Sequence, residues 1–275
     1  MQANIDRDCS CVADQQRAAG LAAELDFKAR SERESVPRAR SAESPGGAVV
    51  EVVCVQPPRA PPAPAASIVP LHGSHHSEAA LCLAAAFLED PVLGRLLFRQ
   101  DAYKCSGAAL FFAHLLNTHY RGGAHSCYIA QGPRGGVQGV CLWQPPGAAQ
   151  GLPLWAMLRM ALVAPSIFGL SRTWRALRTG ALVDEEHERQ TYRHYYLAFL
   201  GVAPTYQGQG AGSALLAPVL KRADAEGVAC YLENSNPANL PFYERAGFKT
   251  VKEIAVGSSS LGEPVMVYAM KREAR

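Results

Sequence analysis

The sequence lacks the features that mark several common classes of protein. Its eight cysteines include no CxxC pair and lie too far apart for a compact zinc motif or disulfide scaffold. Its formal net charge is only +3, too small to imply bulk attraction to nucleic acid or to a membrane surface. We therefore expect reduced thiols in a cytoplasmic protein that has no nucleic-acid or membrane partner.

The hydrophobic pattern of the sequence also gives no sign of a targeting or membrane-spanning segment. Asp6, Asp8 and Asp14 interrupt the first residues, and no continuous apolar run follows them. The longest apolar stretch, residues 152–170, carries Arg159 near its middle. We interpret this stretch as helix of a soluble protein, either buried or lid-like.

Proline and glycine divide the chain into a tail and a domain. Residues 1–65 contain SPGG and a PPRAPPAPAA run, a composition typical of disordered backbone. Within this tail, residues 49–55 are strand-like, and they could add to a sheet edge or form an isolated apolar patch. Residues 66–275 are expected to form one catalytic domain with a helical insert at about 150–190.

Hydrophobic periodicity predicts alternating strands and helices in the domain. Helical spacing across residues 152–179 breaks near Pro165 and Gly169, and residues 184–190 are predicted to be a polar connection. Arg172, Arg175 and Arg178 share one helical face that is expected to be solvated. The predicted strands are 67–71, 125–130, 137–143, 195–202, 228–233, 248–256 and 265–270, and the predicted helices are 77–88, 106–120, 210–226 and 240–246. This order indicates a mixed α/β sheet with crossover helices.

A glycine-rich loop, QGQGAG at residues 207–212, joins an apolar strand to an amphipathic helix. Free backbone amides and the positive end of the helix dipole converge at such a junction, which makes it an anion site fit for a pyrophosphate. A P-loop is excluded because the loop does not end in Gly-Lys-Ser/Thr and no lysine follows it until Lys221. The dinucleotide fingerprint fails because Ser213 or Leu215 stands at its last glycine. A glycine cluster can also be a simple flexible turn, but the flanking strand and helix hold this loop in place.

Two motifs resemble those of GNAT N-acetyltransferases. The stretch LGVAPTYQGQGAGSALL at residues 200–216 resembles their acetyl-CoA signature, Q/R-x-x-G-x-G/A. Residues 231–248, YLENSNPANLPFYERAGF, resemble the second half of the same fold, and with GEPVMVYAMKR at 262–272 they are most similar to small-molecule acetyltransferases of the puromycin N-acetyltransferase type. The resemblance implies the GNAT fold, in which a central mixed, mostly antiparallel β-sheet is splayed at the acetyl-CoA site and flanked by helices.

The resemblance also implies how acetyl-CoA is held as the cosubstrate, with no metal. Main-chain groups of the strand would bind pantetheine, a β-bulge would splay that strand from the next, and the loop amides would bind the pyrophosphate. Asn239 could also cap the helix that follows it, and the two roles are compatible. The implied cofactor residues are Leu200, Gly201, Val202, Gln207, Gly208, Gln209, Gly210, Ala211, Gly212, Ser213, Asn236 and Asn239.

Acetyl transfer to an amine needs a base for the amine and an acid for the departing thiolate. Tyr243 matches the helix tyrosine of the family and is the predicted acid, although it could be a packed aromatic residue beside Phe242. Glu233 and His194 are the candidate bases, acting directly or through water, and either could instead have a structural role. The histidines at positions 72, 75 and 76 lack the accompanying ligands of a metal site.

The function that follows is acetyl transfer to the amine of a small molecule by direct attack in a ternary complex. The acceptor pocket would be formed by residues 77–120 and 152–190, whose apolar insert indicates a covered pocket rather than an open peptide groove. Two alternatives stay open: acetylation of protein N-termini or lysines, and a non-catalytic acyl-CoA-binding sensor. No motif specifies the acceptor or an oligomeric state.

Overall fold

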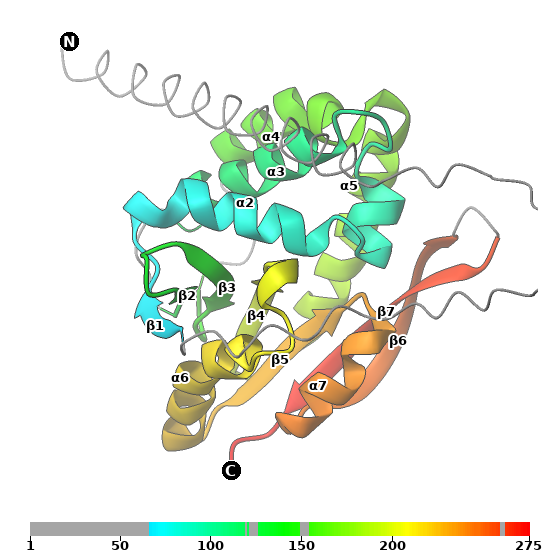
Figure 1. Ribbon diagram of the computed structural model, residues 1–275. Helices are drawn as coiled ribbons and strands as arrows, with labels where there is room; N and C mark the ends of the chain where they lie inside the picture. Colours follow the sequence, from blue (N-terminus) through cyan, green and yellow to red (C-terminus); the bar gives the residue numbers. More distant parts are fainter. Residues whose placement is uncertain (1–65, 119, 121–125, 149–153, 259–261) are drawn as a thin grey trace, which may run out of the picture.

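The computed structural model describes residues 66–118, 120, 126–148, 154–258 and 262–275. The predicted tail at residues 1–65, with its strand-like stretch 49–55, lies outside the described residues. The described chain forms one sheet covered by helices on both faces (Figure 1).

Seven strands form the sheet in the order β1-β2-β3-β4-β5-β7-β6. Neighbouring strands are antiparallel except β4 and β5, which are parallel, so the expected mixed and mostly antiparallel sheet is confirmed. The strand bounds are β1 (Ser67–Pro70), β2 (Tyr128–Gln131), β3 (Val137–Gln144), β4 (His194–Val202), β5 (Ala229–Asn234), β6 (Lys249–Ser258) and β7 (Pro264–Arg272).

Helices cover the two faces of the sheet unequally. Four of them lie together at the top of Figure 1 and pack over one face: α2 (His76–Phe87), α3 (Lys104–Thr118), α4 (Leu154–Phe168) and α5 (Leu170–Glu188). The other face carries α6 (Ala211–Glu226) and α7 (Leu240–Arg245). Short turns complete the described chain: 3-10 helices η2 (Gly73–His75), η4 (Pro204–Tyr206) and η5 (Pro237–Asn239), and a π-helix, η3 (Pro91–Leu97).

Each face has its own apolar core. Beneath α2 and α3, the rings of Phe87, Phe111, Phe112 and Phe199 lie with centroids 5.0 to 6.3 Å apart, mostly edge to face. Beneath α6, the buried side chains include Trp143, fully enclosed on β3. Burial of apolar area on both faces fixes the strand register, because a one-residue slip would turn every strand side chain over.

The outer surface of α4 and α5 remains apolar in places. Trp155, Leu162, Leu170 and Trp174 are each at least half exposed there. None of the described helices is both long and apolar enough to cross a membrane.

The predicted break at Pro165 is wrong. Helix α4 continues through Pro165 to Phe168, and the break comes at Gly169, whose φ of +76° ends the helix. Proline removes one helical hydrogen bond, but Ala164 and Ile167 on either side of it are buried against α3, so packing maintains the helix.

The predicted polar connection at residues 184–190 is also wrong, since α5 extends to Glu188. Glu186 and His187 are buried within it. Glu186 forms ion pairs with Lys252 of β6 and with Arg189. The segment was predicted to be a loop because it is highly charged. Its ion pairs with residues elsewhere in the fold keep it helical.

The basic face of α5 is solvated only in part. Arg175 and Arg178 are exposed, as predicted. Arg172 is half-buried, and its Nη1 donates hydrogen bonds to the carbonyl oxygens of Arg95 and Leu96, at 3.0 and 2.9 Å. This side chain therefore joins α5 to the end of η3.

Candidate active site

Strand β4 opens the sheet at its centre. Leu197 and Phe199 oppose consecutive residues of β3, so Ala198 between them is a β-bulge. The described pairing of β4 with β5 ends at Leu197, opposite Leu232. The two parallel strands separate beyond that pair, and this is the splayed slot that the GNAT resemblance implied.

The glycine loop follows β4 directly and leads into α6. Gly208 and Gly210 have φ of +73° and +86°, in the left-handed region that other residues adopt only at a cost. Gly210 is the N-cap of α6, whose first turn contains no acidic residue. The Gln207 side chain donates to the Val202 carbonyl oxygen at 2.9 Å and ties the loop to its strand. The free amides of α6 are thus presented to an anion.

A groove of about 740 Å³ runs along this loop between β4, α6 and α7. All but one of the predicted cofactor residues line it: Leu200, Gly201, Val202, Gln207, Gly208, Gly210, Ala211, Gly212, Ser213, Asn236 and Asn239. The exception is Gln209, whose Nε2 donates to the Thr205 carbonyl oxygen at 3.2 Å within the loop.

Asn239 does not cap α7. Its side chain makes no capping hydrogen bond, and the residue lines the groove instead. Capping is done one turn earlier by Asn236, whose Oδ1 accepts from the Ala238 amide at 3.1 Å and so begins η5.

A smaller cavity of about 170 Å³ adjoins the groove at the slot between β4 and β5. Both hollows share Phe87, Asp90, Leu200, Asn239 and Tyr243 in their walls. Glu233 lines the smaller one, at the point where β5 leaves β4. We call this hollow the reaction cavity, because it brings the predicted acid and one predicted base together.

The carboxylate of Glu233 is buried, and neither oxygen has a well-formed hydrogen bond to a described residue. Burial raises its pKa to about 7, since a charge is disfavoured away from water. The nearby hydroxyls of Tyr196 and Tyr231 oppose that rise, and Asp184 and Glu186 add to it. A carboxyl group with such a pKa is a competent proton acceptor at neutral pH.

Tyr243 projects from α7 into both hollows. Its ring packs against Phe242 and Phe248, at centroid distances of 5.0 and 6.0 Å. Burial, and to a smaller extent the charge of Asp90, raise the pKa of its phenol well above the usual value. The hydroxyl therefore stays protonated across the physiological range, so it can donate but not accept a proton as phenolate.

His194 lies at the opposite end of β4 and lines neither hollow. Its Nδ1 donates to the Tyr192 carbonyl oxygen at 2.7 Å, so its Nε2 accepts from His187 Nε2 at 2.9 Å. Burial lowers the pKa of both imidazoles, that of His187 to about 4. The geometry favours a structural pair here and leaves Glu233 as the base candidate beside Tyr243.

Asp90 is a site residue that the sequence analysis missed. It is buried at the start of η3, where its Oδ1 accepts from the amides of Val92 and Leu93 at 3.0 and 2.8 Å. Its other oxygen accepts from the Ser235 hydroxyl, just after β5. Asp90 therefore joins the two segments that border the reaction cavity. The Asp-Pro dipeptide, an N-cap before a first-turn proline, is a local signal for the capping but not for the contact with Ser235.

Replacing Asp90 with Ala should destabilise the fold. We expect a loss of about 1–2 kcal/mol from the missing N-cap alone, measured as a lower midpoint of urea unfolding. Glu253→Ala is the control, since Glu253 is an exposed acid of β6 whose side chain has no hydrogen bond or ion pair to the described residues. Equal midpoints for the two variants would contradict the assigned capping.

The histidines near α2 take part in local polar contacts. His75 Nδ1 accepts from the His72 amide at 3.2 Å, and His76 Nδ1 lies 3.1 Å from Asn117 Oδ1. Within the described ranges, no group of three or more His, Cys, Asp or Glu side chains could hold a metal ion.

Comparison with known proteins gives matches in sequence and in fold. Residues 169–248 match the acetyltransferase (GNAT) family. An uncharacterised N-acetyltransferase of Schizosaccharomyces pombe is 28% identical over 187 residues, which cover 63% of this chain and 70% of that protein.

Many solved structures match this chain, and two of them illustrate the shared fold. The first is described as histone acetyltransferase HPA2 and related acetyltransferase from Corynebacterium glutamicum, with a TM-score of 0.55 at 21% identity over 77% of this chain and 97% of that one. The second is arylalkylamine N-acetyltransferase 2 from Aedes aegypti, with a TM-score of 0.53 at 14% identity over 76% and 99% of the two chains.

Proposed function

We propose that this chain is an acetyltransferase of the GNAT superfamily, whose family model matches residues 169–248, and that it transfers acetyl from acetyl-CoA to the amine of a small molecule by direct attack in a ternary complex. The observation that carries the proposal is the convergence of Glu233 and Tyr243 in a cavity continuous with the glycine-loop groove. Within the superfamily, residues 231–248 and 262–272 favour the puromycin N-acetyltransferase type. Cytoplasmic location forms part of the same proposal, supported by the described cysteines, none of which forms a disulfide with another described residue.

The groove fits the diphosphate and pantetheine of acetyl-CoA. A Cβ at Gly210 would project into open space in the groove, and one at Gly212 would lie 3.2 Å from the Phe242 ring. Gly210 therefore allows a ligand to approach the backbone closely, whereas Gly212 leaves room for the Phe242 ring. Loop amides from 207 to 213 would hold the phosphates, and the free main-chain groups of β4 beyond the bulge would hold pantetheine. When bound, acetyl-CoA supplies the thioester carbonyl that the amine attacks.

Glu233 is the proposed general base. It would take the proton of the incoming ammonium, either directly or through one water, and release a neutral amine. Its pKa of about 7 leaves a substantial ionised fraction at neutral pH. The N–C bond then forms as the C–S bond breaks, and the proton that the nitrogen loses on becoming an amide replaces the one that Tyr243 gives to the sulfur.

Tyr243 is the proposed general acid, donating its Oη proton to the departing sulfur. Burial raises the pKa of the phenol, and the same cavity would raise the pKa of a thiol, because both anions lose solvation there. The pKa values of the phenol and the thiol therefore differ less in the cavity than the raised phenol pKa alone implies.

A small acceptor is favoured over a protein because the reaction cavity is narrow and covered. Phe87 of α2, Leu93 of η3 and Val183 of α5 enclose it from the helical face. A small cavity with these apolar side chains over it suits a single amine group entering end-on better than a peptide lying across the site.

Tyr243→Phe tests the acid. We expect kcat to fall by about 10²-fold, because the proton donor is lost while the ring packing stays. The affinity for acetyl-CoA, measured by calorimetry, should be unchanged. Tyr206→Phe is the control, since Tyr206 lines the same groove away from Glu233. Unchanged kcat in Tyr243→Phe would remove the phenol from the mechanism.

The function as a whole is tested by measuring acetyl-CoA binding together with CoA release over a panel of amines and short peptides. Turnover of amines supports the proposal, and turnover confined to peptides would replace it with protein acetylation. Tight binding of acetyl-CoA with no turnover would instead favour an acyl-CoA sensor.

A further inference from the structure

A third hollow, of about 830 Å³, lies beside the reaction cavity and shares Ser235 with it. Its walls come from η3, α5, the turn after β5 and the end of the β6–β7 hairpin at Ser258 and Pro264, where the chain passes from one strand to the next. Strand β7 extends past the end of β5 here, since Asn234, the last residue of β5, pairs with Tyr268. An acceptor reaching the reaction cavity past Ser235 would therefore leave its distal part in this hollow, which we call the distal cavity.

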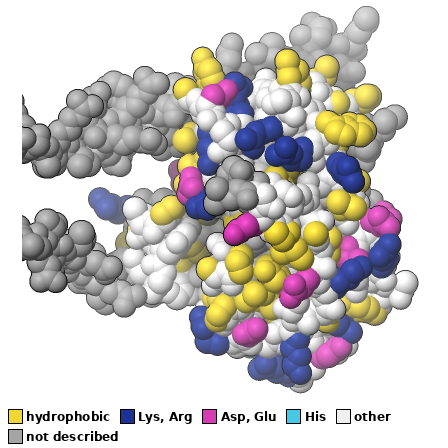
Figure 2. Space-filling view, turned by 90° about the vertical axis from the view of Figure 1, so that its right-hand side faces the viewer, with side chains coloured by type: hydrophobic (Ala, Val, Ile, Leu, Met, Phe, Trp, Pro, Cys, Tyr) yellow, Lys and Arg dark blue, Asp and Glu magenta, His cyan; other side chains and the backbone are white. Residues whose placement is uncertain are grey.

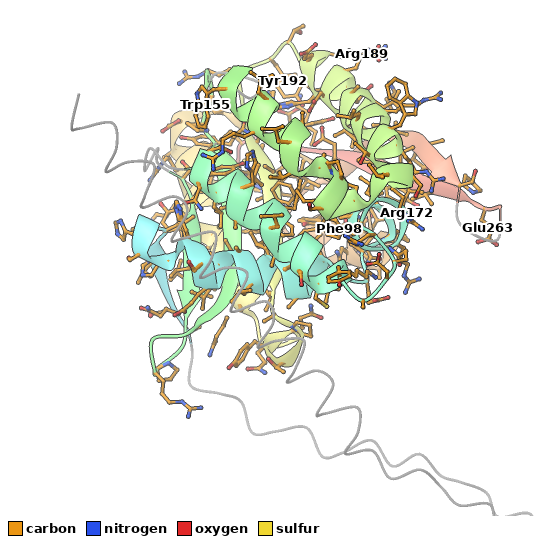
Figure 3. All side chains as sticks on the ribbon, turned by 90° about the horizontal axis from the view of Figure 1, so that it is seen from above. Phe98, Trp155, Arg172, Arg189, Tyr192 and Glu263 are labelled. Atoms are coloured by element: carbon orange, nitrogen blue, oxygen red, sulfur yellow. The ribbon has the colours of Figure 1, made fainter. Side chains whose placement is uncertain are left out.

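The distal cavity is predominantly basic. Its lining has four cationic side chains and two acidic ones, namely Arg95, Lys104, Arg172, Arg175, Glu89 and Glu263. Figure 2 shows basic side chains gathered on the helical upper part of the face that carries the hairpin. Figure 3 shows Arg172 on α5 and Glu263 at the outer end of the hairpin.

The acid nearest to η3 is already paired. Glu89 carboxylate oxygens lie 3.5 Å from Arg95 Nε and 3.3 Å from Lys104 Nζ. Two cations thus share one exposed carboxylate, which leaves the region positive rather than neutral.

The two arginines of α5 carry charge that no described carboxylate balances in an ion pair. Arg172 and Arg175 are three residues apart and therefore project from the same helical face. Arg172 donates to two neutral carbonyl oxygens, which orient its guanidinium without cancelling its charge. Burial and the proximity of Arg175 lower the pKa of Arg172, as expected for two like charges held close together. An anion between them would relieve this repulsion.

We propose that the distal cavity binds an anionic group of the acceptor, a carboxylate or a phosphate, and that Arg175 with Arg172 selects amines that carry such a group. The inference rests on the proposed function and names the substrate class of the same site. Glu233 and Asp90 make the reaction cavity acidic, whereas α5 makes the distal cavity basic. A molecule with an ammonium at one end and an anion at the other is attracted in one orientation and repelled in the reverse one, which places its amine at Glu233.

Arg175→Gln is the variant of choice, because Arg175 has no side-chain hydrogen bond or ion pair to the described residues, whereas Arg172 also holds η3. Arg178→Gln is the matched control, one turn further along α5 and outside the cavity lining. Both changes remove one exposed positive charge from the same helix face.

Two readouts test the proposal. The first is kcat/KM for pairs of amines of equal length, namely straight-chain ω-amino acids and ω-aminoalkyl phosphates against the unsubstituted alkylamines. We expect a preference of about 10- to 100-fold for the anionic member of each pair, typical of a charge-assisted hydrogen bond. Arg175→Gln should remove most of that preference and leave the KM for acetyl-CoA unchanged, and Arg178→Gln should keep it. Comparison of the two anionic series identifies carboxylate or phosphate.

The second readout does not depend on turnover. Titration of the full chain with inorganic phosphate and with glutarate, followed by chemical-shift changes, should show saturable binding that is weakened in Arg175→Gln and retained in Arg178→Gln. Absent saturable binding, or equal binding by both variants, would overturn the anion site, as would alkylamines turned over as well as their anionic partners. If the protein binds phosphate or glutarate saturably but acetylates no amine, the anion site is supported and the proposed function is contradicted.

Discussion

Glu233→Gln should lower kcat/KM for amine acetylation by about 10²- to 10⁴-fold, the usual contribution of a positioned general base. The amide keeps the shape of the side chain but cannot accept the ammonium proton. In the parent protein, kcat/KM should rise with pH through an apparent pKa near 7, because burial raises the pKa of Glu233 to about 7. The variant should lack this rise.

Glu233→Gln should also change how the free energy of unfolding depends on pH. The pKa of Glu233 is about 7 in the folded state and near its ordinary value of 4.5 in the unfolded state, so the folded protein binds more protons between those values. The stability of the parent therefore decreases as pH rises from 4.5 to 7, by up to about 3 kcal/mol. Glu233→Gln should lose this dependence and be more stable than the parent at pH 8, as measured by urea unfolding.

Glu186→Gln provides the control for both measurements. Glu186 is also buried, but it is paired with Lys252 and Arg189 and does not line the reaction cavity. This variant should lose stability and keep the pH dependence of kcat/KM, moved slightly to lower pH because one negative charge near Glu233 is gone. A pH-rate profile of Glu233→Gln that matches the parent would exclude Glu233 as the base.

Gly210→Val should weaken acetyl-CoA binding by more than about 100-fold. A β-branched residue at a φ of +86° costs about 1–3 kcal/mol of backbone strain, and its side chain would fill the groove at the α6 amides. Each charge-assisted hydrogen bond lost to a phosphate oxygen removes about 1.5–3 kcal/mol more. Calorimetric titration with acetyl-CoA measures the change.

Gly227→Val separates backbone strain from loss of the anion site. Gly227 ends the same helix, also has positive φ, and an added Cβ there likewise meets no described atom within 4 Å. It lies outside the groove lining, so its substitution should destabilise the protein without changing acetyl-CoA affinity. Equal affinities for the two variants would rule out the loop as a phosphate site.

The parts of the site that are set by local backbone were predictable from the sequence. Few other residues tolerate the positive φ of Gly208 and Gly210, so the spacing of the glycines is enough to predict the loop. Tyr243 was predictable because its helix carries a motif. Its proximity to Glu233 needed the sheet topology, which brings β5 and α7 to one slot.

Contacts between distant segments were not predictable. The hydrogen bond between Asp90 and Ser235 spans 145 positions, and nothing near either residue indicates the other. His194 is a candidate base from its place at the start of the central strand, but its partner His187 lies on a segment predicted to be a loop. In both cases tertiary packing, rather than local propensity, decides which polar groups meet.

The three tryptophans differ in burial, so their intrinsic fluorescence can be separated by quenching. Trp143 is fully enclosed opposite Leu197, one residue from the bulge in β4, whereas Trp155 and Trp174 are 50% and 75% exposed on α4 and α5. Iodide should quench the red-shifted emission of the two helical indoles and leave a blue-shifted component from Trp143. The emission that remains in the presence of iodide thus reports on the sheet beside the slot. The emission that iodide removes reports on helices α4 and α5.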